Sequence, residues 1–258
     1  MSSVKRGSIL VLLLSIVVSA CGGGSSKTGS GTTLPPPTVA STTTSTTVAA
    51  PPTTNAALVA KATAALFQPT DFPAAFKPQP DQGGTCPADP NINCSSLSLE
   101  TIWHDILTCL AVADTPQAVA TSATYLEGLA TQARATVEYS TADSASAVEA
   151  AVTGPMFQPC VIKAFTADAK RSAPQGATPG AVTVAPLAAP QVGQKVSATR
   201  LNVTMNLSAL PIKLYQDFVV VFNGGTIVRM FFLNPGSGFP STLEQSLLQK
   251  VVTAAGAS

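Results

Sequence analysis

The feature that most constrains the fold is the pattern of residues 200–233, in the C-terminal third of the chain. Apolar and polar residues alternate over 200–207, which is the period of a strand with one buried face. Residues 218–222 are apolar on both sides and predict a central strand. The sequence Asn223-Gly224-Gly225 predicts a tight hairpin turn, so residues 226–233 should return antiparallel. The chain therefore requires an antiparallel sheet at the centre of its fold.

Helices and further strands are predicted on both sides of this region. Apolar residues at three- and four-residue spacing predict helices at 57–67, 97–113, 141–152 and 158–170. Ser241 and Glu244 form a capping box that predicts the start of a final helix. Two further strands are expected at 118–126 and 133–140. Residues 71–93 and 172–191 contain prolines without any period and predict surface loops, the second of which is either functional or disordered.

The grouping of these elements indicates the fold class. Strands in clusters of two and three, with helices between the clusters, are typical of an α+β domain. We expect a mostly antiparallel sheet of about five strands, with helices packed on one face and a concave, exposed groove on the other. One globular domain should span residues 56–258, because a chain of this length can build a single hydrophobic core.

The first 21 residues have the pattern of an export signal. Lys5 and Arg6 precede the apolar residues 9–18, a run shorter than the roughly 20 residues that a membrane-spanning helix needs. The next residues, Val18-Ser19-Ala20-Cys21, resemble the lipobox of bacterial lipoproteins. The resemblance implies that residues 1–20 are a signal peptide and that Cys21 carries diacylglycerol and palmitate. It also implies a lipid-anchored place on the extracytoplasmic face of the cell membrane.

Two alternatives to this interpretation remain open: an ordinary secretory peptide cut after Ala20, and an uncleaved anchor. Residues 22–55, rich in Gly, Ser, Thr and Pro, have almost no large apolar side chains and cannot offset the entropy of ordering. We therefore assign residues 21–55 to the lipidated cysteine and a disordered tether, which would average about 30–35 Å from end to end. Its Thr-rich part is either a plain spacer or an O-glycosylated stalk.

The charge of the chain disfavours a nucleic-acid partner. The formal net charge is +1 and becomes −1 once Lys5 and Arg6 are removed with the signal peptide. No cluster of Lys and Arg follows Arg6, so the chain lacks the basic surface that neutralises phosphates. The expected partners are the membrane, through the lipid, and an unknown small-molecule, lipid or envelope-protein ligand.

Four cysteines remain after Cys21, and export would place them in an oxidising compartment. Of the three possible pairings we favour Cys86–Cys94, which brackets one Pro/Gly-rich loop, and Cys109–Cys160, which would join two helices. Both pairs should act as structural staples. A zinc site is the alternative, but the spacings lack a paired C-x-x-C, so we expect no metal and no cofactor.

The sequence contains none of the common catalytic motifs, such as G-x-S-x-G, a P-loop or H-E-x-x-H. His104, the single histidine, lies on the polar side of the helix at 97–113, so we expect it to be a solvated surface residue. The neighbouring Trp103 borders the apolar stripe and should belong to the core. Two carboxylate pairs, Asp105 with Asp114 and Glu138 with Asp143, have the residue types used in glycoside hydrolysis, but such pairs occur in any domain. We therefore expect no catalytic residues and no enzyme.

The order of elements, the inferred disulfides and the strand–hairpin–helix run at 196–255 resemble small actinobacterial cell-surface lipoproteins. They also resemble the extracellular sensor domains of membrane serine/threonine kinases. The resemblance covers about the last 200 residues and depends on the turn Asp71-Phe72-Pro73, the cysteines, and residues 218–228 as the sheet core. It implies an unidentified ligand bound in a groove over the sheet. Because the chain has no kinase, a signalling role is not implied.

Two classes of function follow from the sequence. The first is a non-catalytic ligand-binding or sensor-like module for a lipid, a glycan or an envelope component, which a cavity or groove lined by sheet residues would support. The second is a structural or interaction lipoprotein that docks another envelope protein, which an exposed apolar patch without a cavity would favour.

Overall fold

The computed structural model describes residues 55–79 and 99–256, apart from 129–130, 174–176, 186, 189, 191, 194 and 208–209. The predicted signal peptide, nearly all of the predicted tether, and the predicted Cys86–Cys94 pair lie outside the described residues. No described helix has both the length and the apolar character needed to cross a membrane.

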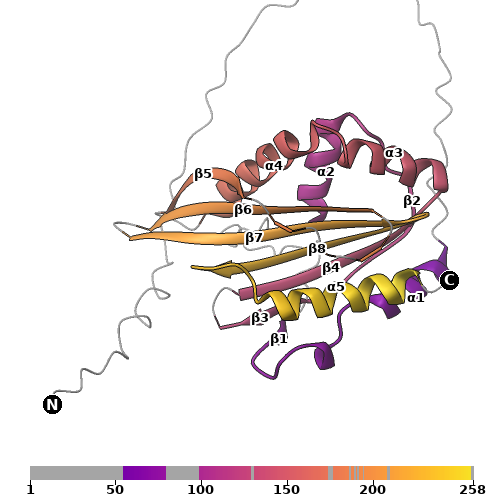
Figure 1. Ribbon diagram of the computed structural model, residues 1–258, viewed down its shortest axis with the longest axis horizontal. Coiled ribbons are helices and arrows are strands. Elements are labelled where there is room, and N and C mark those ends of the chain that lie inside the picture. Colours follow the sequence, from indigo (N-terminus) through magenta and orange to yellow (C-terminus); the bar gives the residue numbers. More distant parts are fainter. Residues whose placement is uncertain are drawn as a thin grey trace, which may run out of the picture. The chain divides into compact units, whose positions relative to one another are not determined.

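The centre of the fold is an eight-stranded sheet in which every paired neighbour is antiparallel (Figure 1). The strands follow one another in space as β1-β3-β4-β8-β7-β6-β5, and β2 pairs with β4 beside β3. Their bounds are β1 (Lys77–Gln79), β2 (Pro116–Thr121), β3 (Thr124–Glu127), β4 (Thr131–Ser140), β5 (Ala177–Ala185), β6 (Lys195–Leu207), β7 (Leu210–Asn223) and β8 (Thr226–Pro235). The α+β class and the antiparallel sheet are confirmed, but the sheet has eight strands and not about five.

Two of the additional strands arise where the sequence indicated one strand or a loop. The segment predicted as a single strand at 118–126 is interrupted between Thr121 and Thr124 and divides into β2 and β3, both paired with β4. The predicted loop at 172–191 contains β5, so that prediction was wrong over residues 177–185. Pro179 is tolerated there because β5 is the edge strand and its register shifts between Pro179 and Val182.

Helices cover both faces of the sheet, so the prediction of helices on one face was wrong (Figure 1). One face is covered by α1 (Ala56–Ala65) and α5 (Ser241–Gly256). The opposite face is covered by α2 (Leu99–Leu110), α3 (Ala142–Val152) and α4 (Phe157–Ser172). The physical reason is that the central strands are apolar on both sides, and each apolar face must be removed from water.

The side chains of β7 show how the two cores are separated. Val219 and Val221 point toward α1 and α5, whereas Phe218, Val220 and Phe222 point toward α2, α3 and α4. All five side chains are essentially buried. Because both faces of this strand are packed, the concave groove expected over the sheet is absent from the described central strands.

The hairpin between β7 and β8 has the predicted turn. Asn223 pairs with Thr226, and Gly224 between them has φ +57, a left-handed conformation that favours glycine. The last helix, α5, begins at Ser241 as expected. Glu244, in the first turn of this helix, is buried and not exposed: the residue is 7% exposed. Its side chain hydrogen-bonds to Asp217 of β7.

Candidate functional site

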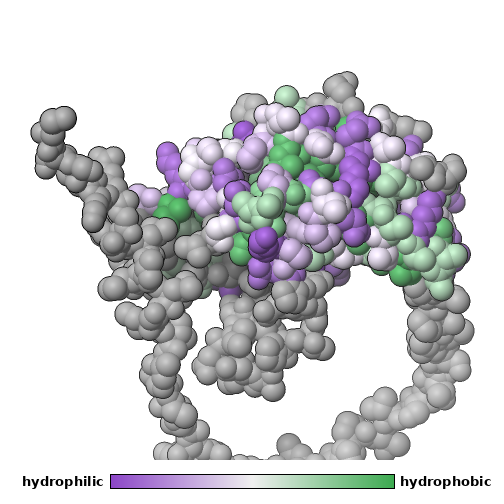
Figure 2. Space-filling model, turned by 90° about the horizontal axis from the view of Figure 1, so that it is seen from below, coloured by the Kyte–Doolittle hydropathy of each residue, from purple (hydrophilic) through white to green (hydrophobic). Residues whose placement is uncertain are grey.

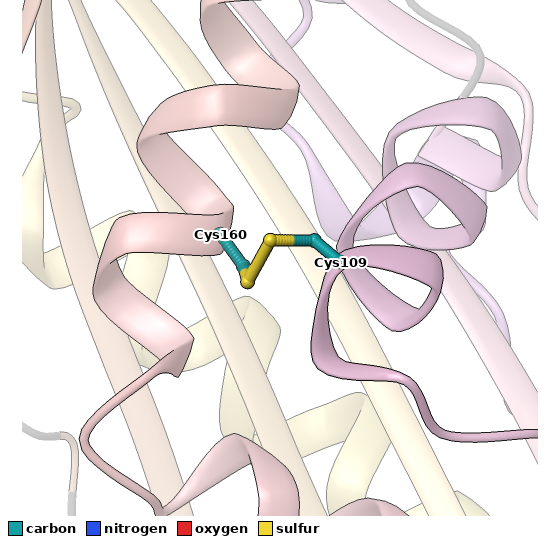
Figure 3. Close-up of a disulfide and its surroundings, with 2 residues drawn as sticks. All are labelled: Cys109 and Cys160. Carbon is teal, nitrogen blue, oxygen red and sulfur yellow. A yellow bond between two sulfur atoms is a disulfide. The ribbon is translucent and has the colours of Figure 1, made fainter.

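The disulfide between Cys109 and Cys160 joins α2 to α4 above the sheet, and the two side chains point toward one another (Figure 3). Their Cα atoms lie 5.6 Å apart. This is one of the two pairs predicted from the sequence. Because Cys160 is fully buried, the bond is positioned to hold the two helices together and not to react with solutes.

The side chains around the single histidine lie as their helical phase predicts. His104 is exposed on α2, and Trp103 is buried against the sheet. Asp105 forms an ion pair with Arg171 of α4 at 3.0 Å, and Asp143 is exposed in the first turn of α3. Neither residue takes part in the carboxylate pairing that lies between α2 and β4.

That pairing joins Asp114, which follows α2, to Glu138 of β4, so each predicted pair contributed one member. The two carboxyls are hydrogen-bonded to each other, and the Ser140 hydroxyl donates to Oε1 of Glu138 at 2.8 Å. Burial and the nearby Asp114 raise the pKa of Glu138 to about 7, although the positive charge of Arg229 opposes this. Near neutral pH Glu138 is therefore partly protonated.

Arg229 of β8 lies beside this acid pair and is 2% exposed. Its Nη2 is 3.2 Å from Oε2 of Glu138 and 3.2 Å from Oε2 of Glu100. Its guanidinium carbon lies 4.9 Å from the centre of the Trp103 ring, a cation–π arrangement. Since Arg229 and Glu138 are almost fully enclosed, a solute could not reach them, and we assign this cluster to stability.

A second polar cluster lies on the opposite face of the sheet. Arg200 of β6 donates from Nε and Nη2 to the two carboxylate oxygens of Asp217 on β7, each at 2.6 Å. Burial, followed by the charge of Asp217, raises the pKa of Glu244 to about 7. Gly238 packs directly over the arginine, because a Cβ there would lie 2.7 Å from Nη2 of Arg200. This cluster ties α5 and the loop before it to the sheet.

An open cleft of about 660 Å³ lies where β6 extends past the end of β5, and we call it the β6 cleft. One wall is the turn between α3 and α4, and the other consists of the end of β5 and the start of β6. The described lining residues are Val152, Thr153, Gly154, Pro155, Phe157, Gln158, Val184, Ala185, Leu187, Val196, Ser197, Ala198 and Thr199. None of them carries a charge, so the cleft offers apolar surface, hydroxyl groups and backbone groups.

Sequence reasoning did not predict the β6 cleft. The predicted helix at 141–152 ends just before the α3–α4 turn, and residues 184–187 lie in the predicted loop at 172–191. The lining comes from segments that are adjacent only after the strands pair. Among the described residues, no group of three His, Cys, Asp or Glu side chains is placed to hold a metal ion.

Comparison with known proteins gives little further information. No protein-family model matches the chain. No curated protein matches it either. One solved structure is similar in part: a protein of unknown function from Pseudomonas aeruginosa, PA94, described as a putative regulator, with 13% sequence identity. The likeness covers 49% of this chain and 72% of that one, and its TM-score of 0.21 supports no argument about fold or function.

The described surface has few exposed apolar side chains. Met156 and Ile212 are its exposed large hydrophobic residues, at 58% and 38% exposure. Viewed from below the orientation of Figure 1, hydrophobic and hydrophilic residues are interspersed over the coloured surface (Figure 2). Met156 lies in the α3–α4 turn between Pro155 and Phe157, which both line the β6 cleft. One of these two side chains, Met156, therefore adjoins the cleft, whereas Ile212 lies on β7 opposite Met205 of β6.

Proposed function

We propose that the chain is a non-catalytic, lipid-anchored extracytoplasmic lipoprotein that binds its ligand in the β6 cleft. The anchoring part of the proposal is supported by the lipobox-like residues 18–21. The binding part is carried by one observation: the described lining of a 660 Å³ cleft, within the usual size range of ligand sites, contains apolar and hydroxyl side chains and no charged ones.

The lining favours binding over catalysis. General acid–base chemistry needs a titratable side chain within hydrogen-bond reach of the reacting group. The described lining offers none, since its polar side chains are the hydroxyls of Thr153, Ser197 and Thr199 and the amide of Gln158. Glu138 and Glu244, whose pKa values are raised to about 7, do not line the cleft. An uncharged ligand, or an uncharged part of a larger one, is best matched to this surface.

The alternative function is docking of another envelope protein. A flat apolar patch would favour it, but the described surface exposes only two large hydrophobic side chains, of which Met156 adjoins the cleft. A protein partner would therefore also be expected to use the β6 cleft. The two classes of function therefore use the same site, the β6 cleft, and differ only in whether a small ligand or a protein occupies it.

Anchoring is tested by the substitution Cys21→Ser in the native host, followed by separation of membrane and soluble fractions. We expect the wild type in the membrane fraction with a lipid-modified mass at Cys21, and the variant to lose this mass and its membrane association. If the variant remains as firmly membrane-bound as the wild type, lipid anchoring through Cys21 is refuted.

Binding is tested by native mass spectrometry of the full protein purified from its own membranes. Gln158 is exposed on α4 and lines the cleft, so Gln158→Trp should fill the site at little cost to folding. Gln245→Trp, at an exposed position of α5, is the matched control. We expect an additional bound mass on the wild type and on the control, and its loss from Gln158→Trp. A bound mass retained equally by all three proteins would place the ligand elsewhere.

A further inference from the structure

One part of strand β6 has no strand partner on its outer side among the described residues. β5 pairs with β6 only from Ala185, opposite Arg200, to Ala177, opposite Leu207. Residues 195–199 of β6 continue past this point and are paired on one side, with residues 218–222 of β7. The other side of this stretch borders the β6 cleft, because residues 196–199 line it.

The register identifies which backbone groups face the cleft. Asn223 and Thr226 close a two-residue hairpin, so their backbone groups are bonded to each other. Backbone N–H and C=O groups alternate in direction along a strand, which turns those of Phe222 and Val220 toward β6. Their partners on β6 are Lys195 and Ser197. The N–H and C=O groups of Val196 and Ala198 therefore point away from β7 and into the cleft.

This stretch also lacks the protection that sheet edges usually carry. Natural edges are kept from pairing by proline, charged side chains, bulges or short strands. β5 has Pro179 and a register shift, and β1, at the other end of the sheet, has three residues that include Lys77 and Pro78. Residues 196–199, Val-Ser-Ala-Thr, have neither proline nor charge. The adjacent Lys195 is engaged in an ion pair with Glu149 of α3.

We propose that residues 195–199 of β6 bind an extended polypeptide segment of another protein, which adds to the sheet as a strand in line with β5. This inference rests on the proposed function, since it specifies the ligand of the β6 cleft. A polypeptide is the partner whose own N–H and C=O groups repeat at the spacing of Val196 and Ala198. The edge stretch would accommodate about five residues of such a segment, or roughly 17 Å.

The lining of the cleft specifies the kind of segment. Alternate side chains of an added strand would point to the side of the α3–α4 turn, where Phe157 and Val152 lie. A charged side chain there would lose water and find no opposite charge in the described lining. The occupant should therefore be uncharged at these positions, with small or β-branched residues that favour an extended backbone.

The test selects random nine-residue peptides displayed on phage against the full-length lipoprotein in detergent micelles. Counter-selection uses Ala198→Pro, which removes an N–H that faces the cleft and leaves the pairing with β7 intact. We expect enriched peptides that are uncharged at alternate positions and bind Ala198→Pro about tenfold more weakly or worse, as the loss of backbone hydrogen bonds implies. Methylation of single backbone nitrogens of the peptide should abolish binding at every second position only, because alternate N–H groups of an added strand face β6.

Two controls separate folding from binding. Ser197→Pro removes an N–H that points to β7, so it should lower the melting temperature, whereas Ala198→Pro should not. If Ala198→Pro also unfolds, Gln158→Trp serves as the second variant, since it blocks the wall of the cleft and leaves the edge unchanged. Peptide binding should be lost in Gln158→Trp and kept in Gln245→Trp.

Several results would overturn strand addition. They are the absence of enriched peptides, equal binding to the variants, and N-methyl effects without alternation. A wild-type dimer that Ala198→Pro converts to a monomer would identify a second copy of this chain as the occupant and refute a partner peptide. If the wild type binds no peptide but carries a small molecule that Gln158→Trp displaces, strand addition is refuted and the proposed function is retained. Absence of both a bound mass and peptide binding refutes both.

Discussion

Glu138 on β4 and Arg229 on β8 form an ion pair inside the fold, with 3.2 Å between Oε2 and Nη2 and side-chain exposures of 1% and 2%. The pair lies between the sheet and α2, where Glu100 and Trp103 also contact the arginine. Breaking such a pair leaves a buried charge without compensation. On the α2 side of the sheet, β4 is thus held by electrostatics, whereas β7 is held by apolar packing.

The substitution Arg229→Met should lower the free energy of unfolding by about 3–5 kcal/mol, because it leaves the buried carboxyl of Glu138 without its counter-charge. Urea unfolding at pH 7 measures this change. Lys163→Met, at an exposed position of α4, is the control and should change stability by less than about 0.5 kcal/mol. The double variant Arg229→Met/Glu138→Leu should recover part of the loss. An effect of Arg229→Met as small as that of the control would contradict this role.

Stability should increase as the pH falls from 8 to 5. Burial raises the pKa of Glu138 and of Glu244 from 4.5 to about 7, so the folded state holds protons that the unfolded state releases. This contribution is fully present below about pH 4.5 and is lost as the pH rises through about 7. Urea midpoints across this range measure it. Glu138→Gln and Glu244→Gln should each flatten the profile, whereas Glu127→Gln should not.

Removal of the disulfide should destabilise the domain. Cys109 and Cys160 are 51 residues apart, and closing a loop of that length contributes at most about 4 kcal/mol in the chain-entropy model. Cys109→Ser/Cys160→Ser should therefore show a marked loss in urea unfolding. Peptide mapping without reduction should recover Cys109 linked to Cys160, and we predict a second link between Cys86 and Cys94. A map with four free thiols would contradict both links.

The elements that depend on neighbouring residues were predictable from the sequence. The hairpin at 218–233 needs only a local apolar run and Asn223-Gly224-Gly225, and it formed as expected. β5 was missed because Pro179 was interpreted as a loop residue, although proline is compatible with an edge strand. The apolar residues on both sides of β7 already required two helical layers, and one layer was inferred instead.

The polar clusters and the cleft depend on residues far apart in the chain, so spacing could not reveal them. The two carboxylate pairs were chosen by closeness in sequence, and they separated Asp114 from Glu138. Arg229 is 129 residues from Glu100, and the two meet only because β8 lies beside β4 under α2. The β6 cleft required knowing where β5 ends, which is a property of strand register.

The most direct measurement places a photo-crosslinking amino acid at position 158, in the wall of the β6 cleft, in the living host. The same residue at position 245 is the control. We expect irradiation to produce one defined covalent adduct at 158 and none at 245. No adduct at 158, or the same adducts at both positions, would contradict a ligand site in this cleft.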